Sequence, residues 1–141
     1  KISDWVSGGT VPDAPPAYII IKCWNEIESV QNELINKYYN LVNIAQVKSA
    51  NIIDFDYEQK TYKNSSSRKK QIEEIYELLK ITSDSKKIIN NLRMMRNEAA
   101  HGKENEISMT DALRYRDLTR QVINELYSKA NIIDGNLNSD M

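Results

Sequence analysis

One short segment, "RNEAAH", holds the side chains of this chain best suited to chemistry: Arg96, Asn97 and His101, the single histidine. An arginine presents a planar fork of N–H donors that can bind phosphate through two parallel hydrogen bonds. A histidine can take up or release a proton near neutral pH. Such a pair could cleave RNA without a metal, because attack by the 2′-hydroxyl needs a proton acceptor, a proton donor and a cation beside the phosphorane.

The spacing of the segment separates the arginine from the histidine. At about 100° per residue, positions 96 and 101 lie about 140° apart around a regular helix, whereas positions 97 and 101 lie about 40° apart. Asn97 is therefore the expected neighbour of His101, and Arg96 is expected to lie beside the apolar stripe. Arg96 and His101 converge only if the helix ends or loosens before His101, or if a second subunit contributes.

Four amphipathic helices are expected to position this segment, because apolar residues recur at helical spacing and no stretch alternates long enough for a convincing strand. They run from 17 to about 48, from about 67 to 81, from an N-cap at Ser83 or Asp84 to near Gly102, and from 108 to about 129. The links between the last three helices are short, so the predicted fold is all-α, an antiparallel four-helix bundle.

The predicted apolar stripes define the core of this bundle. Gln31 interrupts the first stripe, and Ser108 with Asp111 has capping-box spacing at the start of the last helix. Gly102 is of a type enriched just past helix ends, so His101 lies in or beside a C-terminal turn, where the helix dipole suits a cationic imidazole. The predicted core residues are Ile20, Trp24, Ile27, Leu34, Tyr38, Leu41, Ala45, Ile72, Ile75, Tyr76, Leu79, Ile88, Leu92, Met95, Ala99, Leu118, Val122 and Leu126.

The length of 141 residues fits one domain. Residues 1–16 hold all three prolines and are expected to be an irregular lead-in, with Pro15 or Pro16 in the first helical turn. Residues 17–129 form the helical domain, and 130–141 are expected to be a flexible tail. Residues 49–66 are predicted to be a long loop. The first residue is Lys1, so the domain could be the soluble part of a longer or membrane-anchored protein.

Composition excludes several classes of site. The net charge of −1 provides no global positive field, so contacts with nucleic acid must be local. One cysteine, Cys23, excludes an intrachain disulfide, and with one histidine it leaves no zinc ligand set. No apolar run is long enough to span a bilayer. We therefore expect a cytoplasmic domain with no metal and no cofactor.

The core "RN..AH" of the segment, together with an early "P...I...W..IE" pattern, resembles the HEPN superfamily over residues 15–128. The early pattern consists of Pro16, Ile20, Trp24, Ile27 and Glu28. The resemblance implies an all-helical domain whose active members cut RNA without a metal, in clefts formed across a homodimer. It further implies that Arg96 holds phosphate, that His101 transfers a proton and that Asn97 orients the imidazole. A defence or toxin-type system, with an antitoxin or another partner protein, is the implied setting.

A second candidate site is a phosphate-facing patch, since five of the six arginines fall within residues 93–120. Its predicted phosphate-binding members are Arg93, Arg116 and Arg120. Interleaved acidic residues could instead neutralise it.

The "RNEAAH" segment also has a purely structural interpretation. His101 would cap its helix, and Arg96 would lay its stem on apolar surface and pair with a carboxylate. The candidate partners are Glu26, Glu28 and Glu98. The chain would then be a non-catalytic helical interaction or dimerisation module.

Overall fold

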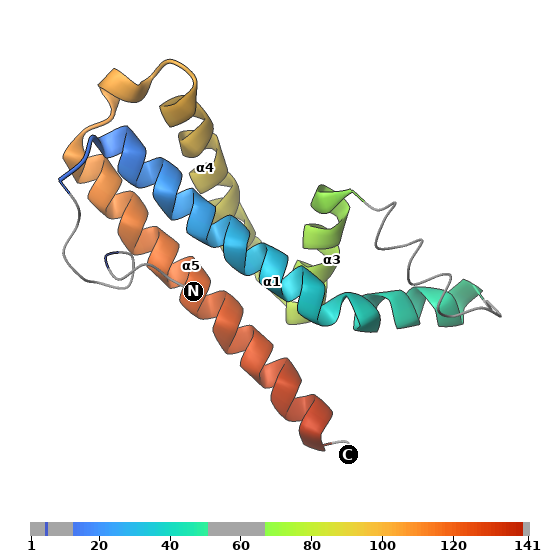
Figure 1. The fold of residues 1–141 in the computed structure, drawn as a ribbon. Helices are drawn as coiled ribbons and strands as arrows, with labels where there is room; N and C mark the ends of the chain where they lie inside the picture. The colour runs from blue at the N-terminus through green and yellow to red at the C-terminus, as the bar shows by residue number, and fades with distance from the viewer. Residues whose placement is uncertain (1–4, 6–12, 51–66, 140–141) are drawn as a thin grey trace. The chain divides into compact units, whose positions relative to one another are not determined.

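A computed structural model of the chain describes residues 5, 13–50 and 67–139, with side chains described up to Tyr38 in the first helix and up to Asn136 in the last. Within these residues the chain is helical and contains no strand (Figure 1), so the all-α prediction is confirmed. The α-helices are α1 (Pro16–Ala50), α3 (Arg68–Leu79), α4 (Ser83–Ala100) and α5 (Met109–Ser139), and a short 3-10 helix, η1 (Glu104–Glu106), links α4 to α5. None of the described helices is long and apolar enough to cross a membrane.

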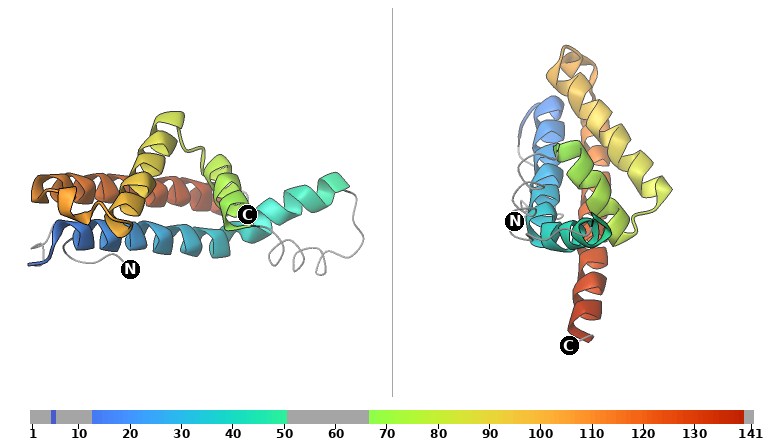
Figure 2. Two further views of the ribbon diagram at one scale, coloured as in Figure 1. Left: turned by 90° about the horizontal axis from the view of Figure 1, so that it is seen from above. Right: turned by 90° about the vertical axis from the view of Figure 1, so that its right-hand side faces the viewer.

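The chain divides into two compact units, one comprising residues 1–30 with 81–141 and the other residues 31–80. The first unit contains the start of α1 together with α4, η1 and α5. In it the start of α1 lies beside α5 in each view, and α4 runs antiparallel to both (Figures 1 and 2). All residues of the "RNEAAH" segment therefore belong to the first unit.

Each helix start follows from the residue that precedes or opens it. Pro16 is the first residue of α1, as predicted. At α5 the capping box is confirmed, since the Asp111 amide donates to Ser108 Oγ over 3.0 Å and the Ser108 amide to Asp111 Oδ2 over 3.5 Å. The N-cap of α4 is Thr82, whose Oγ1 accepts the Ser85 amide, so the predicted cap at Ser83 or Asp84 is wrong. Several adjacent residues can cap, and spacing alone does not choose among them.

The last helix continues well past its predicted end at 129, because α5 reaches Ser139. Residues 130–139 are thus helix, and the predicted flexible tail is wrong over this stretch. Ala130 is buried and Ile133 is half-buried, so this part of the helix still covers apolar surface. The first helix likewise ends at Ala50 rather than near 48, and the remainder of the predicted loop, 51–66, lies outside the described residues.

Most of the predicted core is buried, with one change of face in α4. Ile72 and Leu118 are half-buried, and Leu41 and Ala45 lie outside the residues whose side chains are described. Ile88 is 36% exposed and Met95 is half-buried, whereas Ile89 and Leu92 are buried. Because apolar residues stand at both 88 and 89, the sequence allows two apolar stripes rotated by about 100° from each other. The packing of the helices buries the stripe that contains Ile89. Arg96 lies one turn after Leu92, on the edge of the buried face. Buried residues of the first unit include Ile19, Ile20, Cys23, Trp24, Ile27, Ile89, Leu92, Ala99, Ala112, Tyr115, Val122, Ile123 and Leu126.

In the second unit, the polar residue that interrupts the apolar stripe of α1 is buried. Gln31 is only 4% exposed, and its Nε2 donates to the hydroxyl of Tyr76 over 2.7 Å. Arg68 Nη2 donates to Gln31 Oε1 over 2.7 Å, and Arg68 Nε donates to Asn32 Oδ1 over 3.1 Å. Burial raises the pKa of Tyr76, while the Gln31 hydrogen bond and the Arg68 charge lower it. Gln31 thus joins α1 to α3 by meeting two polar partners at once.

We expect Gln31→Leu to lower the free energy of unfolding by about 1–3 kcal/mol, because the buried Tyr76 hydroxyl loses its donor and Arg68 loses its acceptor. Urea denaturation of the full chain measures this change. The exposed Asn36→Ala, also on α1, is the control and should change the free energy of unfolding by no more than about 0.5 kcal/mol. Equal stability of Gln31→Leu and the wild type would contradict the role of the hydrogen bonds.

Candidate active site

The C-terminal end of α4 is formed by two backbone amides that converge on one carbonyl. The amides of His101 and Lys103 donate to Glu98 O over 3.4 and 3.1 Å. Gly102 lies between them with φ 108°, a conformation that glycine adopts without the Cβ penalty. The predicted end of the helix at Gly102 is therefore confirmed, and His101 is its C-cap with φ −128° and ψ 46°.

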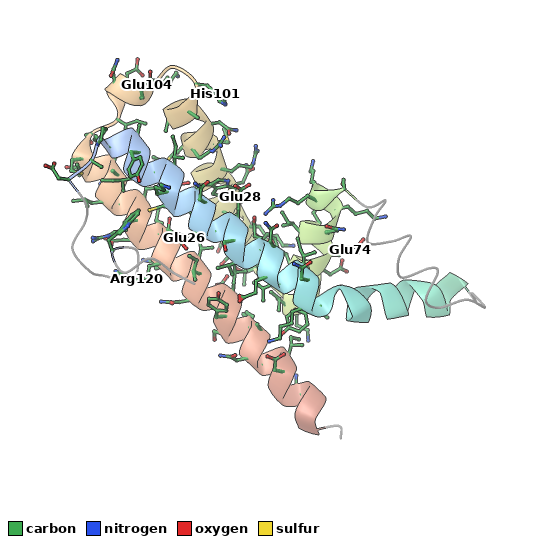
Figure 3. All side chains as sticks on the ribbon, in the orientation of Figure 1. Glu26, Glu28, Glu74, His101, Glu104 and Arg120 are labelled. Atoms are coloured by element: carbon green, nitrogen blue, oxygen red, sulfur yellow. The ribbon has the colours of Figure 1, made fainter. Side chains whose placement is uncertain are left out.

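His101 caps α4 through its backbone and leaves its side chain exposed (Figure 3). Among the residues that the structure describes, the imidazole has no hydrogen-bond partner. The helix ends at Ala100, directly before the histidine, which meets one of the two conditions for Arg96 and His101 to converge. No hydrogen bond joins the two described side chains. A substrate or a second subunit could therefore reach the imidazole from solvent.

The Arg96 side chain is half-buried and is bonded to its chain neighbour. Its Nη1 donates to Asn97 Oδ1 over 3.3 Å, and its Nε is enclosed without an acceptor among the described residues. The structural interpretation expected a carboxylate partner here, and the hydrogen-bond partner is an amide. Asn97 is thus joined to Arg96 rather than to His101, its neighbour on the helical wheel. The wheel locates Cα positions, whereas a long arginine side chain can fold back to the next residue.

Tyr115 on α5 forms a hydrogen bond with α4, the helix that carries Arg96. Its ring is buried, and its hydroxyl donates to Leu92 O over 2.8 Å. Burial raises the pKa of Tyr115, as do Cys23 and Glu28, while the Arg96 guanidinium lowers it. A buried tyrosine needs a partner for its hydroxyl, but nothing in the sequence identifies a backbone carbonyl as that partner.

The predicted arginine patch is divided between two different settings. Arg116 and Arg120 each form an ion pair with Asp117, with Nη2–Oδ1 distances of 3.2 and 3.4 Å, so one of the interleaved acidic residues holds both. Arg93 Nη2 instead donates to Asn90 Oδ1 on its own helix over 2.9 Å. Figure 3 shows Arg120 on α5, well apart from His101 at the end of α4. The structure therefore does not gather the three predicted arginines around His101.

Cys23 is buried on α1 in the same unit, beside the inner face of α5. Burial raises the pKa of its thiol from 9.0 to about 12, against the lowering effects of the Thr119 hydrogen bond and the Arg116 charge. Cys23 thus fills space in the core of the first unit. Within the described part of the chain, no three His, Cys, Asp or Glu side chains are grouped as a metal-ligand set.

Comparison with known proteins identifies one family. The model of the RiboL-PSP-HEPN family matches residues 10–131, which include the "RNEAAH" segment and the start of each described α-helix. No curated protein and no solved structure matches the chain.

We expect iodoacetamide to alkylate native Cys23 at least about a hundredfold more slowly at pH 8 than the urea-unfolded chain, because burial leaves very little thiolate. Since the folded pKa is raised to about 12, the native rate should continue to rise above pH 9, where an ordinary thiol levels off. Mass spectrometry at a series of pH values measures both rates. A native rate that levels off near pH 9 would show that the thiol is not shielded.

Proposed function

The chain belongs to the RiboL-PSP-HEPN family, and from this membership we propose that it is a metal-independent endoribonuclease that acts as a homodimer. The observation that carries the proposal is the grouping at the end of α4. There Arg96 is bonded to Asn97, and the exposed His101 is the C-cap of the same helix. The single cysteine, Cys23, suits a reducing compartment, so the proposed location is the cytoplasm.

In the proposed reaction Arg96 binds the scissile phosphate and His101 acts as general acid. The 2′-hydroxyl attacks phosphorus and loses its proton to water, while the bond from phosphorus to the 5′-oxygen breaks and the imidazolium gives its proton to that oxygen. The products are a 2′,3′-cyclic phosphate and a 5′-hydroxyl. The Nη2 atom of Arg96 makes no hydrogen bond within the described residues, which leaves it available for the charge that develops on the phosphorane.

A second copy of the chain completes the proposed site. Arg96 is half-buried and bonded to Asn97, whereas His101 is exposed at the helix end, and no hydrogen bond joins the two side chains within one copy. The outer side of α4 carries Ile88 and Met94, which are 36% and 50% exposed, and Met95 is half-buried beside them. Apolar side chains on an exposed helix face favour association with another protein surface. In the proposed dimer the two α4 helices meet there, and each copy supplies an arginine for the histidine of the other.

The alternative function is a non-catalytic interaction module that binds a partner protein, such as the antitoxin of a defence system. The Arg96–Asn97 hydrogen bond and the backbone cap at His101 favour it, because both contacts also suit a helix end with a structural role. Under this alternative His101→Ala would leave partner binding intact.

For the ribonuclease, we expect the purified chain to cleave RNA in the presence of EDTA and to leave 2′,3′-cyclic phosphate ends. His101→Ala should lower the rate at least about a hundredfold, the usual contribution of a general acid. The exposed Asn124→Ala on α5 is the control and should keep the wild-type rate. Intact RNA at high concentrations of the wild-type chain would reject the catalytic proposal.

For the dimer, we expect a mass near twice the 16.3 kDa of one chain by light scattering. Dimers reassembled from equal amounts of Arg96→Ala and His101→Ala should recover about a quarter of the wild-type activity, because half of them are mixed and each mixed dimer retains one intact pair. Each variant alone should be inactive. If the mixture stays inactive while wild-type chains treated in the same way recover, the arginine and histidine do not come from different copies.

A further inference from the structure

Two hydrogen bonds between described residues of α4 and α5 attach α4 at different points along its length. Near its start, Ser85 Oγ donates to Glu125 Oε1 over 2.9 Å. Farther along, the Tyr115 hydroxyl donates to Leu92 O over 2.8 Å. The second attachment lies one helical turn before Arg96, so it is the one that can affect the position of the "RNEAAH" segment.

The Leu92 carbonyl links Tyr115 directly to the backbone of Arg96. In an α-helix the amide of residue i donates to the carbonyl of residue i−4, so the Arg96 amide and the Tyr115 hydroxyl share this acceptor. A carbonyl oxygen has two lone pairs and can accept both. A sideways or rotational shift of the turn that carries Arg96 would therefore stretch the Tyr115 hydrogen bond.

The Arg96 side chain is confined at the same place. Its Nε is enclosed and its Nη1 is bonded to Asn97. The hydrogen bond of Tyr115 to Leu92 O thus restrains the backbone turn from which this confined side chain extends. Catalytic groups need this kind of support, because a displacement of about 1 Å can cost about a hundredfold in rate.

We infer that Tyr115 is a positioning residue for Arg96, whose hydroxyl holds the Arg96 turn of α4 against α5 so that the guanidinium faces the scissile phosphate. Its importance for RNA cleavage rests on the proposed function, whereas the restraint on Arg96 can be tested without any substrate. Two variants on the same helix pair serve as controls.

Ser85→Ala removes the other attachment between α4 and α5. Thr119→Val removes a second buried hydroxyl from α5, one that donates to Tyr115 O on its own helix over 2.9 Å. Both changes are expected to destabilise the chain while leaving the Tyr115–Leu92 bond in place. A general loss of stability would thus appear in all three variants, and a loss of positioning only in Tyr115→Phe.

The first test uses NMR on the full chain without RNA. In Tyr115→Phe the Arg96 amide should exchange with solvent about two- to tenfold faster, the factor for one lost hydrogen bond, and the Nε–Hε resonance of Arg96 should shift. In Ser85→Ala and Thr119→Val both signals should stay as in the wild type. Unchanged Arg96 signals in Tyr115→Phe, or equal changes in all three variants, would overturn the inference.

The second test measures RNA cleavage by the same variants. Tyr115→Phe should lower kcat by about ten- to hundredfold with little change in KM, whereas the controls keep the wild-type kcat. A wild-type kcat in Tyr115→Phe, with a wild-type chain that cleaves RNA, would overturn the positioning role alone. If the wild-type chain does not cleave RNA, the proposed function fails, and the NMR result still decides whether Tyr115 restrains Arg96.

Discussion

The hydrogen bond from the Tyr115 hydroxyl to the Leu92 carbonyl is the contact on which the candidate site depends. It joins α4 to α5 at a point where both Leu92 and Tyr115 are buried, so water does not compete for the carbonyl or the hydroxyl. On its α4 side the next turn carries Arg96 and Asn97, and the helix then ends at Gly102. The position of the "RNEAAH" segment thus depends on the Tyr115–Leu92 hydrogen bond, which is made one helical turn before Arg96.

Arg96 in this position lowers the stability of the folded chain. An arginine remains charged at any physiological pH, and its Nε is enclosed without an acceptor among the described residues. Such an orphaned donor lowers stability, because it has lost water without gaining a partner. The hydrogen bond to Asn97 and the partial exposure of the side chain offset part of that cost. Retained strain or desolvation at one charged residue is common where a ligand is to be bound.

In the second unit, both polar groups of the buried residue Gln31 have hydrogen-bond partners. Gln31 has a donor to offer Tyr76 and an acceptor to offer Arg68, and both are used. A network in which the buried amide meets its partners stabilises the junction of α1 with α3 and specifies their alignment. In the first unit, by contrast, the Nε atoms of Arg96 and Arg116 are both enclosed without an acceptor among the described residues.

The sequence by itself determined that the chain is helical, where several of the helices begin or end, and the presence of a polar segment at one helix end. These features depend on neighbours within four residues, so Pro16, the Ser108–Asp111 box and Gly102 could be recognised from their types and spacing. Family resemblance also followed from the sequence, since it rests on residue types at fixed intervals.

Only the tertiary structure decided which side of α4 is buried, how far α5 extends and what Arg96, Asn97 and Tyr115 contact. Ile88 and Ile89 are equally apolar, and the choice between them depends on the surfaces of α1 and α5. The bond of Tyr115 to Leu92 O joins residues far apart in the chain, and that carbonyl has the same chemistry in every residue type. Contacts of this kind leave no pattern in the sequence, because they are set by how the helices pack rather than by the residues within each helix.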